Sequence, residues 1–173
     1  MPASVEVRVL HGAAPGLGVD ATSQTLRLKQ SDDDVQNAQF PVPIPAAGTN
    51  YSWRKTFLLV VTSPPDNAIS NLRFFSDGGS LGAGRLVLFG RDPAYTQATA
   101  ADETAAVSAV DATVLTSVAP EVLVPGQLVS DLDPVPTKGT GQDHVELQLA
   151  IDPTATVGNS AAAIVFRYRY NES

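Results

Sequence analysis

The strongest constraint on the fold is a repeated alternation of apolar and polar residues at every second position. Valines alternate with charged residues over residues 5–9, and the same period returns at residues 26–28, 145–151 and 164–170. In an extended chain, a period of two places all the apolar side chains on one face. Each segment therefore predicts a half-buried β-strand.

Other segments predict strands by their apolar and β-branched content. Residues 53–62, 69–76 and 85–89 predict more fully buried strands, and residues 112–118 and 121–124 are weaker candidates. The glycine-rich residues 77–84 predict a hairpin loop between two of these strands. Because Gly, Pro and Asp turns separate the strands, the sequence predicts an all-β fold. We expect a single antiparallel β-sandwich or jelly roll of about eight strands, with long loops and at most one short helix.

A chain of 173 residues is long enough to bury its own core, so we expect one domain spanning residues 1–173. Residues 1–50 are candidates to include an extended arm, with a proline-alternating edge or linking segment at residues 41–45. Residues 124–143 contain three prolines and three glycines and predict a long irregular loop. The alanine-rich residues 97–110 predict a short helix or an ordered loop.

The amino-acid composition excludes several kinds of catalytic and metal-binding site. The chain has no cysteine, which excludes disulfides, zinc–thiolate sites and a cysteine nucleophile. Its longest apolar run, residues 57–61, is far shorter than the roughly 20 residues that span a bilayer. The first residues lack the basic and apolar regions of a secretory leader. We therefore expect neither membrane insertion nor a secretory signal.

The charge is acidic and uneven. The net charge is −7, and residues 92–166 carry ten acidic residues against one base, Lys138. A chain with no basic stripe lacks the electrostatic signature of a nucleic-acid-binding protein, so we expect no nucleic-acid partner. The acidic stretch is either a set of solvated loops or a surface for a basic protein partner.

Two glycine motifs imitate catalytic or cofactor signatures. Residues 78–82 match the G-x-S-x-G pattern of serine hydrolases around Ser80, and residues 16–21 imitate a dinucleotide-binding fingerprint. Both signatures require a helix to follow, whereas a strand pattern follows each of them here. His11 and His144 are the only histidines, and each stands at a strand end without a sequence-level partner. We therefore predict no catalytic residue and no cofactor.

Two groups are candidates for binding. Asp32, Asp33 and Asp34 form the one tight acidic cluster, which is either a weak calcium-type metal site or a solvated turn. Tyr51 and Trp53 project to the same side of an extended chain and could form a stacking platform for a sugar. The alternative for this aromatic pair is core or interface packing.

The central and final segments resemble the β-rich virion proteins of tailed bacteriophages. The residues that carry the resemblance are ISNLRFFSDG (69–78), RLVLFG (85–90), AYTQ (94–97) and FRYRYNE (166–172). The similarity covers about half of the chain and is one of texture, without a diagnostic motif. It points to head decoration (cement) and accessory structural proteins. The resemblance implies a β-sandwich or jelly roll that binds a capsid or tail lattice, commonly as a symmetric oligomer, without catalytic residues.

Three hypotheses follow. The first is a non-enzymatic capsid decoration protein located in the virion and assembled in the bacterial cytoplasm, with the major capsid protein or other virion proteins as partners. We expect a homo-oligomer, with a trimer favoured. The second is a carbohydrate-binding β-sandwich module that uses Trp53 and Tyr51, with Asp32–Asp34. The third is a hydrolase that uses Ser80 and His144.

Overall fold

A computed structural model describes residues 3–63, 68–100, 107–128, 136–157 and 163–172. Within these ranges the chain forms ten β-strands and one short 3-10 helix. The elements are β1 (Ser4–Leu10), β2 (Val19–Asp20), β3 (Asn50–Tyr51), β4 (Lys55–Ser63), β5 (Ile69–Ser76), β6 (Arg85–Asp92), β7 (Val107–Asp111), η1 (Ala112–Val114), β8 (Glu121–Val122), β9 (His144–Ile151) and β10 (Phe166–Glu172).

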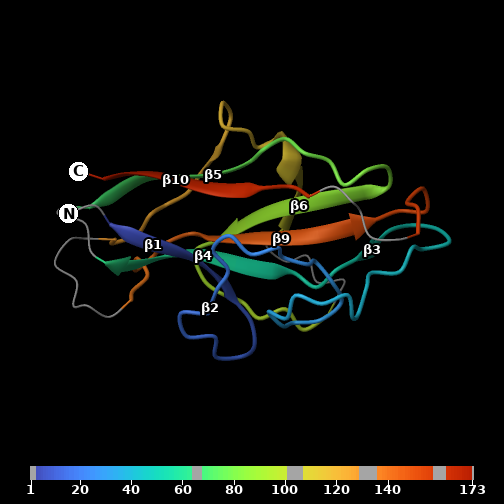
Figure 1. Cartoon of the computed structure of the whole chain (residues 1–173), viewed down its shortest axis with the longest axis horizontal. Helices are drawn as coiled ribbons and strands as arrows, with labels where there is room; N and C mark the ends of the chain where they lie inside the picture. Colours follow the sequence, from blue (N-terminus) through green and yellow to red (C-terminus); the bar gives the residue numbers. More distant parts are fainter. Residues whose placement is uncertain (1–2, 64–67, 101–106, 129–135, 158–162, 173) are drawn as a thin grey trace.

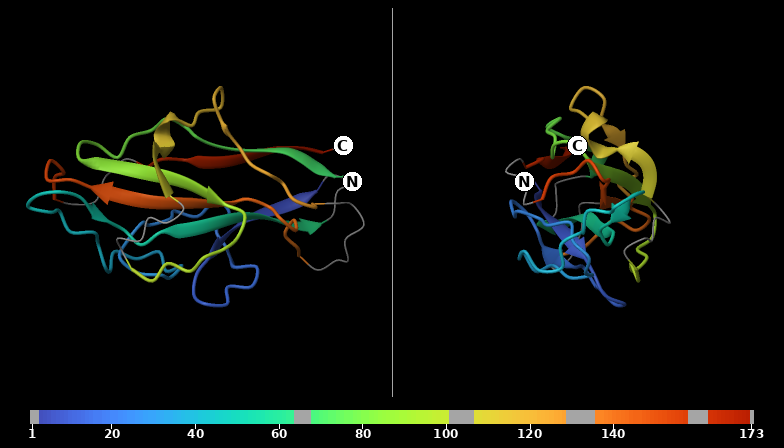
Figure 2. Two further views of the ribbon diagram at one scale, coloured as in Figure 1. Left: turned by 180° about the vertical axis from the view of Figure 1, so that it is seen from behind. Right: turned by 90° about the vertical axis from the view of Figure 1, so that its right-hand side faces the viewer.

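The strands form two antiparallel sheets that face each other. The large sheet has the order β2-β1-β4-β9-β6-β7, with β3 also paired to β9, and the small sheet has the order β10-β5-β8. Figure 1 shows β10 and β5 lying over the large sheet, and Figure 2 shows the two layers along the long axis of the molecule. The expected all-β sandwich is confirmed.

The core lies between the sheets and is centred on Phe74 of β5. Its ring stacks on Phe89 of the large sheet at 5.6 Å and on Phe166 of β10 at 5.5 Å, and Tyr168 meets it edge-on at 5.3 Å. Phe74 is 2% exposed. Because Phe89 comes from the opposite layer, this aromatic cluster joins the two sheets directly.

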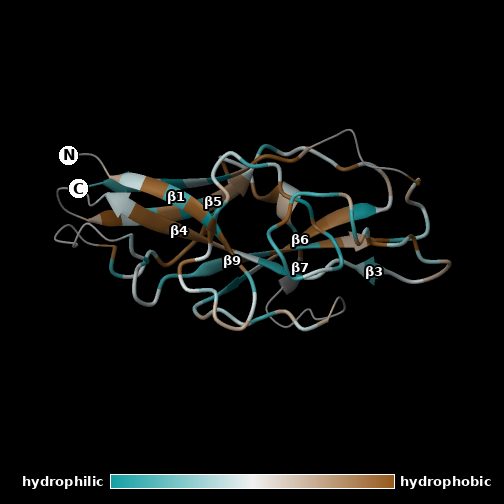
Figure 3. Cartoon of the chain, turned by 60° about the horizontal axis from the view of Figure 1, so that its bottom comes forward, coloured by the Kyte–Doolittle hydropathy of each residue, from teal (hydrophilic) through white to brown (hydrophobic). Residues whose placement is uncertain are grey.

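The face of the large sheet turned away from the small sheet, here called the outer face, is also buried at its centre. Leu58 and Val60 of β4 have no exposed surface and pack with Leu10, Leu17 and Tyr95. Leu17 and Tyr95 belong to two irregular segments, residues 11–18 and 93–98, here called the covering segments. Figure 3 shows the apolar strands β4, β5 and β6 in brown among loops of mixed hydropathy.

The strands expected at residues 5–9, 53–62, 69–76, 85–89, 145–151 and 164–170 correspond to β1, β4, β5, β6, β9 and β10. The expected hairpin at residues 77–84 is wrong. β5 belongs to the small sheet and β6 to the large sheet, so these residues cross between layers. The apolar and β-branched content of residues 69–76 and 85–89 predicts two buried strands. It does not specify whether these strands pair with each other or lie in different layers.

The strand expected at residues 26–28 is also wrong, because this segment lies outside both sheets. Leu26 and Leu28 nevertheless pack against the main core. The alternation therefore predicted correctly that Leu26 and Leu28 face the core. A strand also requires hydrogen-bond partners for its backbone, and the sequence pattern does not specify them.

Two further expectations in the second half of the chain need correction. Residues 107–110 belong to β7 rather than to a helix, residues 97–100 form no helix, and residues 101–106 lie outside the described ranges. The candidate strand at residues 112–118 is wrong, because residues 115–118 are irregular and residues 112–114 form η1. The Asp111 side chain accepts a hydrogen bond from Thr113 N at 2.8 Å and caps this turn. The candidate at residues 121–124 is a strand only at Glu121–Val122.

The long loop expected at residues 124–143 is irregular in its described parts, which are 124–128 and 136–143. It is tied to the strands at both ends. Gln142 Nε2 donates to Leu59 O at 3.0 Å, Thr137 forms a bridge with Val61, and Ile69 N donates to Leu128 O at 2.9 Å. Residues 3–50, which were expected to include an arm, contribute β1 to β3 and pack on the same core through Val9 and Leu28.

The aromatic cluster gives a direct test of what joins the layers. Replacing Phe74 with Ala removes the ring that contacts both sheets, so we expect the free energy of unfolding to fall by about 3–5 kcal/mol. The control Phe40→Ala changes a side chain that is 58% exposed and is expected to cost less than about 1 kcal/mol. Urea unfolding followed by fluorescence measures both. Equal losses in the two variants would contradict the central role of Phe74.

Candidate functional site

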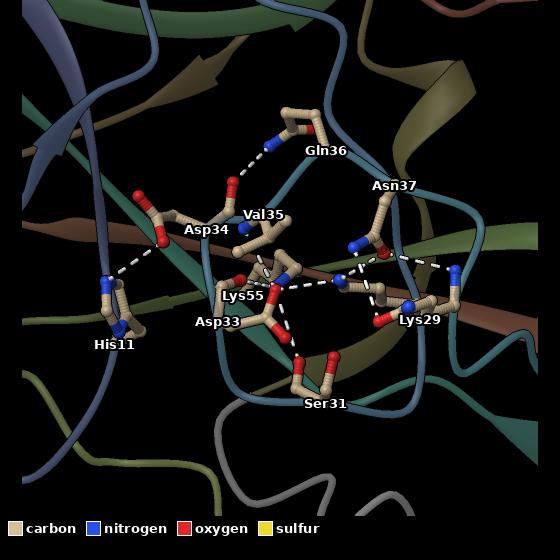
Figure 4. A network of polar contacts seen from close by, with 10 residues as sticks. His11, Lys29, Ser31, Asp33, Asp34, Val35, Gln36, Asn37 and Lys55 are labelled. Atoms are coloured by element: carbon tan, nitrogen blue, oxygen red, sulfur yellow. Dashed lines mark hydrogen bonds and ion pairs between the residues drawn. The ribbon is translucent and has the colours of Figure 1, made fainter.

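The acidic cluster lies in an irregular loop, residues 31–37, here called the acidic loop. Asp33 Oδ1 forms an ion pair with Lys29 Nζ at 2.8 Å. Lys55 Nζ, at the start of β4, donates to the backbone carbonyls of Asp33 and Ser31. Figure 4 shows both ammonium groups turned toward this loop. Two lysines of the chain itself therefore compensate and position Asp33.

The other two carboxylates point to different partners. Asp32 Oδ2 accepts hydrogen bonds from Gly12 N at 2.9 Å and from Gln97 Nε2 at 3.1 Å, which links the acidic loop to both covering segments. Asp34 Oδ1 lies 3.6 Å from His11 Nε2. The three carboxylates thus do not converge on one point.

The charged groups around the acidic loop hold the loop in place against the rest of the protein. Lys29 and Lys55 are each only 3% exposed. Burial lowers the pKa of Lys55, and the nearby Asp33 charge opposes this shift. Burial alone would raise the pKa of Asp33, but hydrogen bonds from Lys29, Ser31 and Val35 outweigh it and hold this pKa below its usual value. Asp33 is therefore held ionised by groups that also fix the loop.

For a metal ion the same geometry is unfavourable. Calcium requires several oxygen ligands around one point, and here each carboxylate already has a partner of its own. Within the described ranges no group of three or more histidine or acidic side chains is arranged to hold a metal ion. The acidic loop is better described as a tie between the start of β4 and the two covering segments.

A second polar group is buried beneath the covering segments. Arg54 Nε lies 3.1 Å from Glu146 Oε1, and neither side chain has exposed surface. Arg54 Nη2 also donates to Thr96 O at 2.8 Å, so the ion pair holds one covering segment against the outer face. Tyr95 adds a hydrogen bond from its hydroxyl to Gly12 O at 2.8 Å, which joins the two covering segments. Burial, with the nearby Asp32 charge, raises the pKa of Tyr95 to about 12.

Ser80 and His144 are far apart. Residues 77–84 lead into β6 at Arg85, which pairs with Ile151, whereas His144 pairs with Asp92 at the other end of the same two strands. Seven residues of strand separate the two ends, or roughly 20 Å. Ser80 Oγ accepts from Gly82 N at 3.1 Å, and the contact of His144 Nδ1 is with Asp92 O at 3.2 Å. The structure does not bring Ser80 and His144 together as a catalytic pair.

The two aromatic candidates have different surroundings. Tyr51 is half-buried and packs against Leu88 and Ala150. Trp53 is also half-buried, and its backbone N–H donates to Lys29 O at 2.9 Å. A shallow depression of about 230 Å³ lies near Tyr51 and shares Ala150 with it. The lining residues are Thr49, Gly84, Arg85, Leu86, Ala150 and Asp152, so neither Tyr51 nor Trp53 contributes to it.

The structure also brings together a group that the sequence did not single out. Arg73, Arg167 and Arg169 lie on the side of the small sheet that faces away from the core, around Phe75. This surface is here called the arginine face. Alternation alone indicates that Arg167 and Arg169 lie opposite the buried Phe166 and Tyr168. Only the register of β10 against β5 shows that Arg73 joins them.

Comparison with known protein families, with curated proteins and with solved structures finds no match to this chain. Within the described residues there is no helix of sufficient length and apolarity to cross a membrane.

The buried ion pair generates a prediction that a double-mutant cycle can test. Arg54→Met or Glu146→Leu alone leaves one charge buried without its partner, so each is expected to lower the free energy of unfolding by about 3–5 kcal/mol. The double variant removes both charges and is expected to lose much less than the sum of the two. Chemical unfolding of the four proteins measures the coupling. Losses that simply add would show that Arg54 and Glu146 do not stabilise each other.

Proposed function

We propose that this chain is a non-enzymatic structural protein of a virion, of the capsid decoration (cement) type. It binds the capsid lattice as a symmetric homo-oligomer, with a trimer favoured, and stabilises it. The observation that carries this proposal is that the buried charged side chains hold the protein's own loops in place. The buried charged groups Lys29, Lys55, Arg54 and Glu146 brace loops against the sheet, so the features available to a partner are surfaces.

Three further points support the proposal. The antiparallel β-sandwich agrees with the fold that the resemblance to phage virion proteins implies. Internally braced loops give the rigid surface that a repeated lattice contact requires, because every copy must present the same shape. Many copies on one particle also turn a modest affinity per copy into strong attachment. The partner is then the major capsid protein or another virion protein, and the protein assembles in the bacterial cytoplasm.

The alternative is a carbohydrate-binding module at Tyr51. The observation that favours it is the depression near Tyr51, where Asp152 and Arg85 supply polar groups and Leu86 an apolar wall. Its volume is below the roughly 300–1,000 Å³ of typical small-molecule pockets. Tyr51 and Trp53, which the aromatic platform would require, both lie outside the lining. A protein-binding role therefore accounts for more of the structure.

The test is the presence of the chain in assembled particles. We expect mass spectrometry of virions purified from cells that carry the encoding phage genome to find the chain in many copies per particle. We also expect virions without it to lose DNA at a lower temperature. Absence from the purified particles would rule out the virion role. Saturable binding on a glycan array that is lost in Tyr51→Ala, by a protein absent from virions, would favour the alternative.

A further inference from the structure

The arginine face is built by strand register. Arg167 pairs with Phe75 and Arg169 pairs with Arg73 across β10 and β5, and Arg73 pairs with Val122 of β8 on its other side. Residues paired across a sheet share a face, so the three guanidinium groups lie on one surface. Arg169 lies over the Phe75 ring at 5.6 Å, an arrangement that fixes one of these cations against the sheet.

Unlike several basic groups of the described chain, these three arginines have no carboxylate partner, and they lie together on one surface. Lys29, Arg54 and Arg91 each have a carboxylate partner, at distances from 2.8 to 3.5 Å. In the described ranges no carboxylate lies within ion-pair distance of Arg73, Arg167 or Arg169. Arg73 Nη1 is in addition enclosed without a hydrogen-bond acceptor, which is a costly state for a charged donor. The described part of the chain thus carries a cationic surface without carboxylate partners, although the net charge of the full sequence is −7.

β10 also forms an edge of the small sheet. Among the described strands it pairs only with β5, so the opposite side of Phe166–Glu172 presents backbone N–H and C=O groups without strand partners. At seven residues it is longer than the other edge strands described in the two sheets, which are β2, β3, β7 and β8. Such an edge can accept an additional extended strand through main-chain hydrogen bonds.

Charge selects the kind of strand that can be added. If β10 of a second copy paired antiparallel with this edge, Arg167 and Arg169 of the two copies would lie opposite one another in the registers where these residues overlap. Like charges directly opposite one another destabilise a sheet. A strand with carboxylates at alternate positions would place them beside Arg167 and Arg169 instead. A nucleic acid has no peptide backbone that could extend the sheet, so it would leave the strand edge unused.

We infer that the β10 edge and the arginine face together form a docking site for an acidic, extended polypeptide segment of a partner protein. The segment adds as a strand beside β10, and its alternate carboxylates pair with Arg167 and Arg169. This inference rests on the proposed function for its setting and names the surface and the chemistry by which the chain binds its partner. Its test uses the purified protein alone, so the two can fail separately.

The probe is a fluorescently labelled peptide of eight residues in which Glu alternates with Val or Thr. We expect saturable binding by fluorescence anisotropy that weakens as salt is added, because the contacts are ionic at their outer side. Arg167→Glu/Arg169→Glu is expected to weaken binding at least about tenfold. The matched control Arg27→Glu/Lys138→Glu makes the same change in net charge elsewhere and is expected to retain most of the affinity. Circular dichroism checks that both variants are folded.

Two comparison probes separate strand addition from simple charge attraction. A peptide of the same charge with proline at alternate positions cannot form the ladder and is expected to bind more weakly than the parent peptide. Single-stranded oligothymidine of similar charge is also expected to bind more weakly. Absence of saturable peptide binding, equal loss in the two charge variants, or tighter binding of the proline peptide or the oligonucleotide would overturn the inference. So would self-association of the protein that Arg167→Glu/Arg169→Glu abolishes.

Discussion

Burial of the central strand β4 on both faces is the constraint from which most of the structure follows. Residues 55–61 are all buried, yet the small sheet covers only one side of the large sheet. The second side must be covered by irregular chain, and the covering segments provide this through Leu17 and Tyr95. Irregular backbone over an apolar face needs hydrogen-bond partners that no sheet supplies. Side chains therefore supply them, as where Arg54, buried beneath the segment at residues 93–98, donates to Thr96 O.

Because β4 is buried on both faces, the residues that the sequence suggested as catalytic or metal-binding candidates take a structural role. The acidic loop ties both covering segments to the start of β4, through Asp32 and the two lysines around Asp33. Tyr95, Gln97 and Glu146 act in the same network. A reactive or metal-binding role would require these groups to be open to a ligand, whereas here they hold one another. The arginine face, on the opposite layer, has no such compensation among the described residues.

Much of the fold could be predicted from the sequence because an alternating pattern reports which face of a segment is buried. The alternating pattern located β1, β9 and β10, and the apolar and β-branched content of the other segments located β4, β5 and β6. Neither signal could reveal that residues 77–84 cross between layers, or that residues 26–28 pack without pairing, since both depend on which strand becomes a neighbour. The site was less predictable for the same reason. Asp32–Asp34 were visible as a cluster, but their partners at Gly12, Lys29 and His11 come from contacts that only folding creates.

We propose that this protein acts by binding through the small sheet, while its buried polar groups hold its own loops in place. Hydrogen–deuterium exchange followed by mass spectrometry, comparing the free protein with the protein bound in assembled particles, tests it most directly. We expect the amides of residues 166–172 to gain protection on assembly because they acquire a strand partner, while those of residues 31–37 change little. Protection gained in residues 31–37 or near Tyr51, with none in β10, would contradict it.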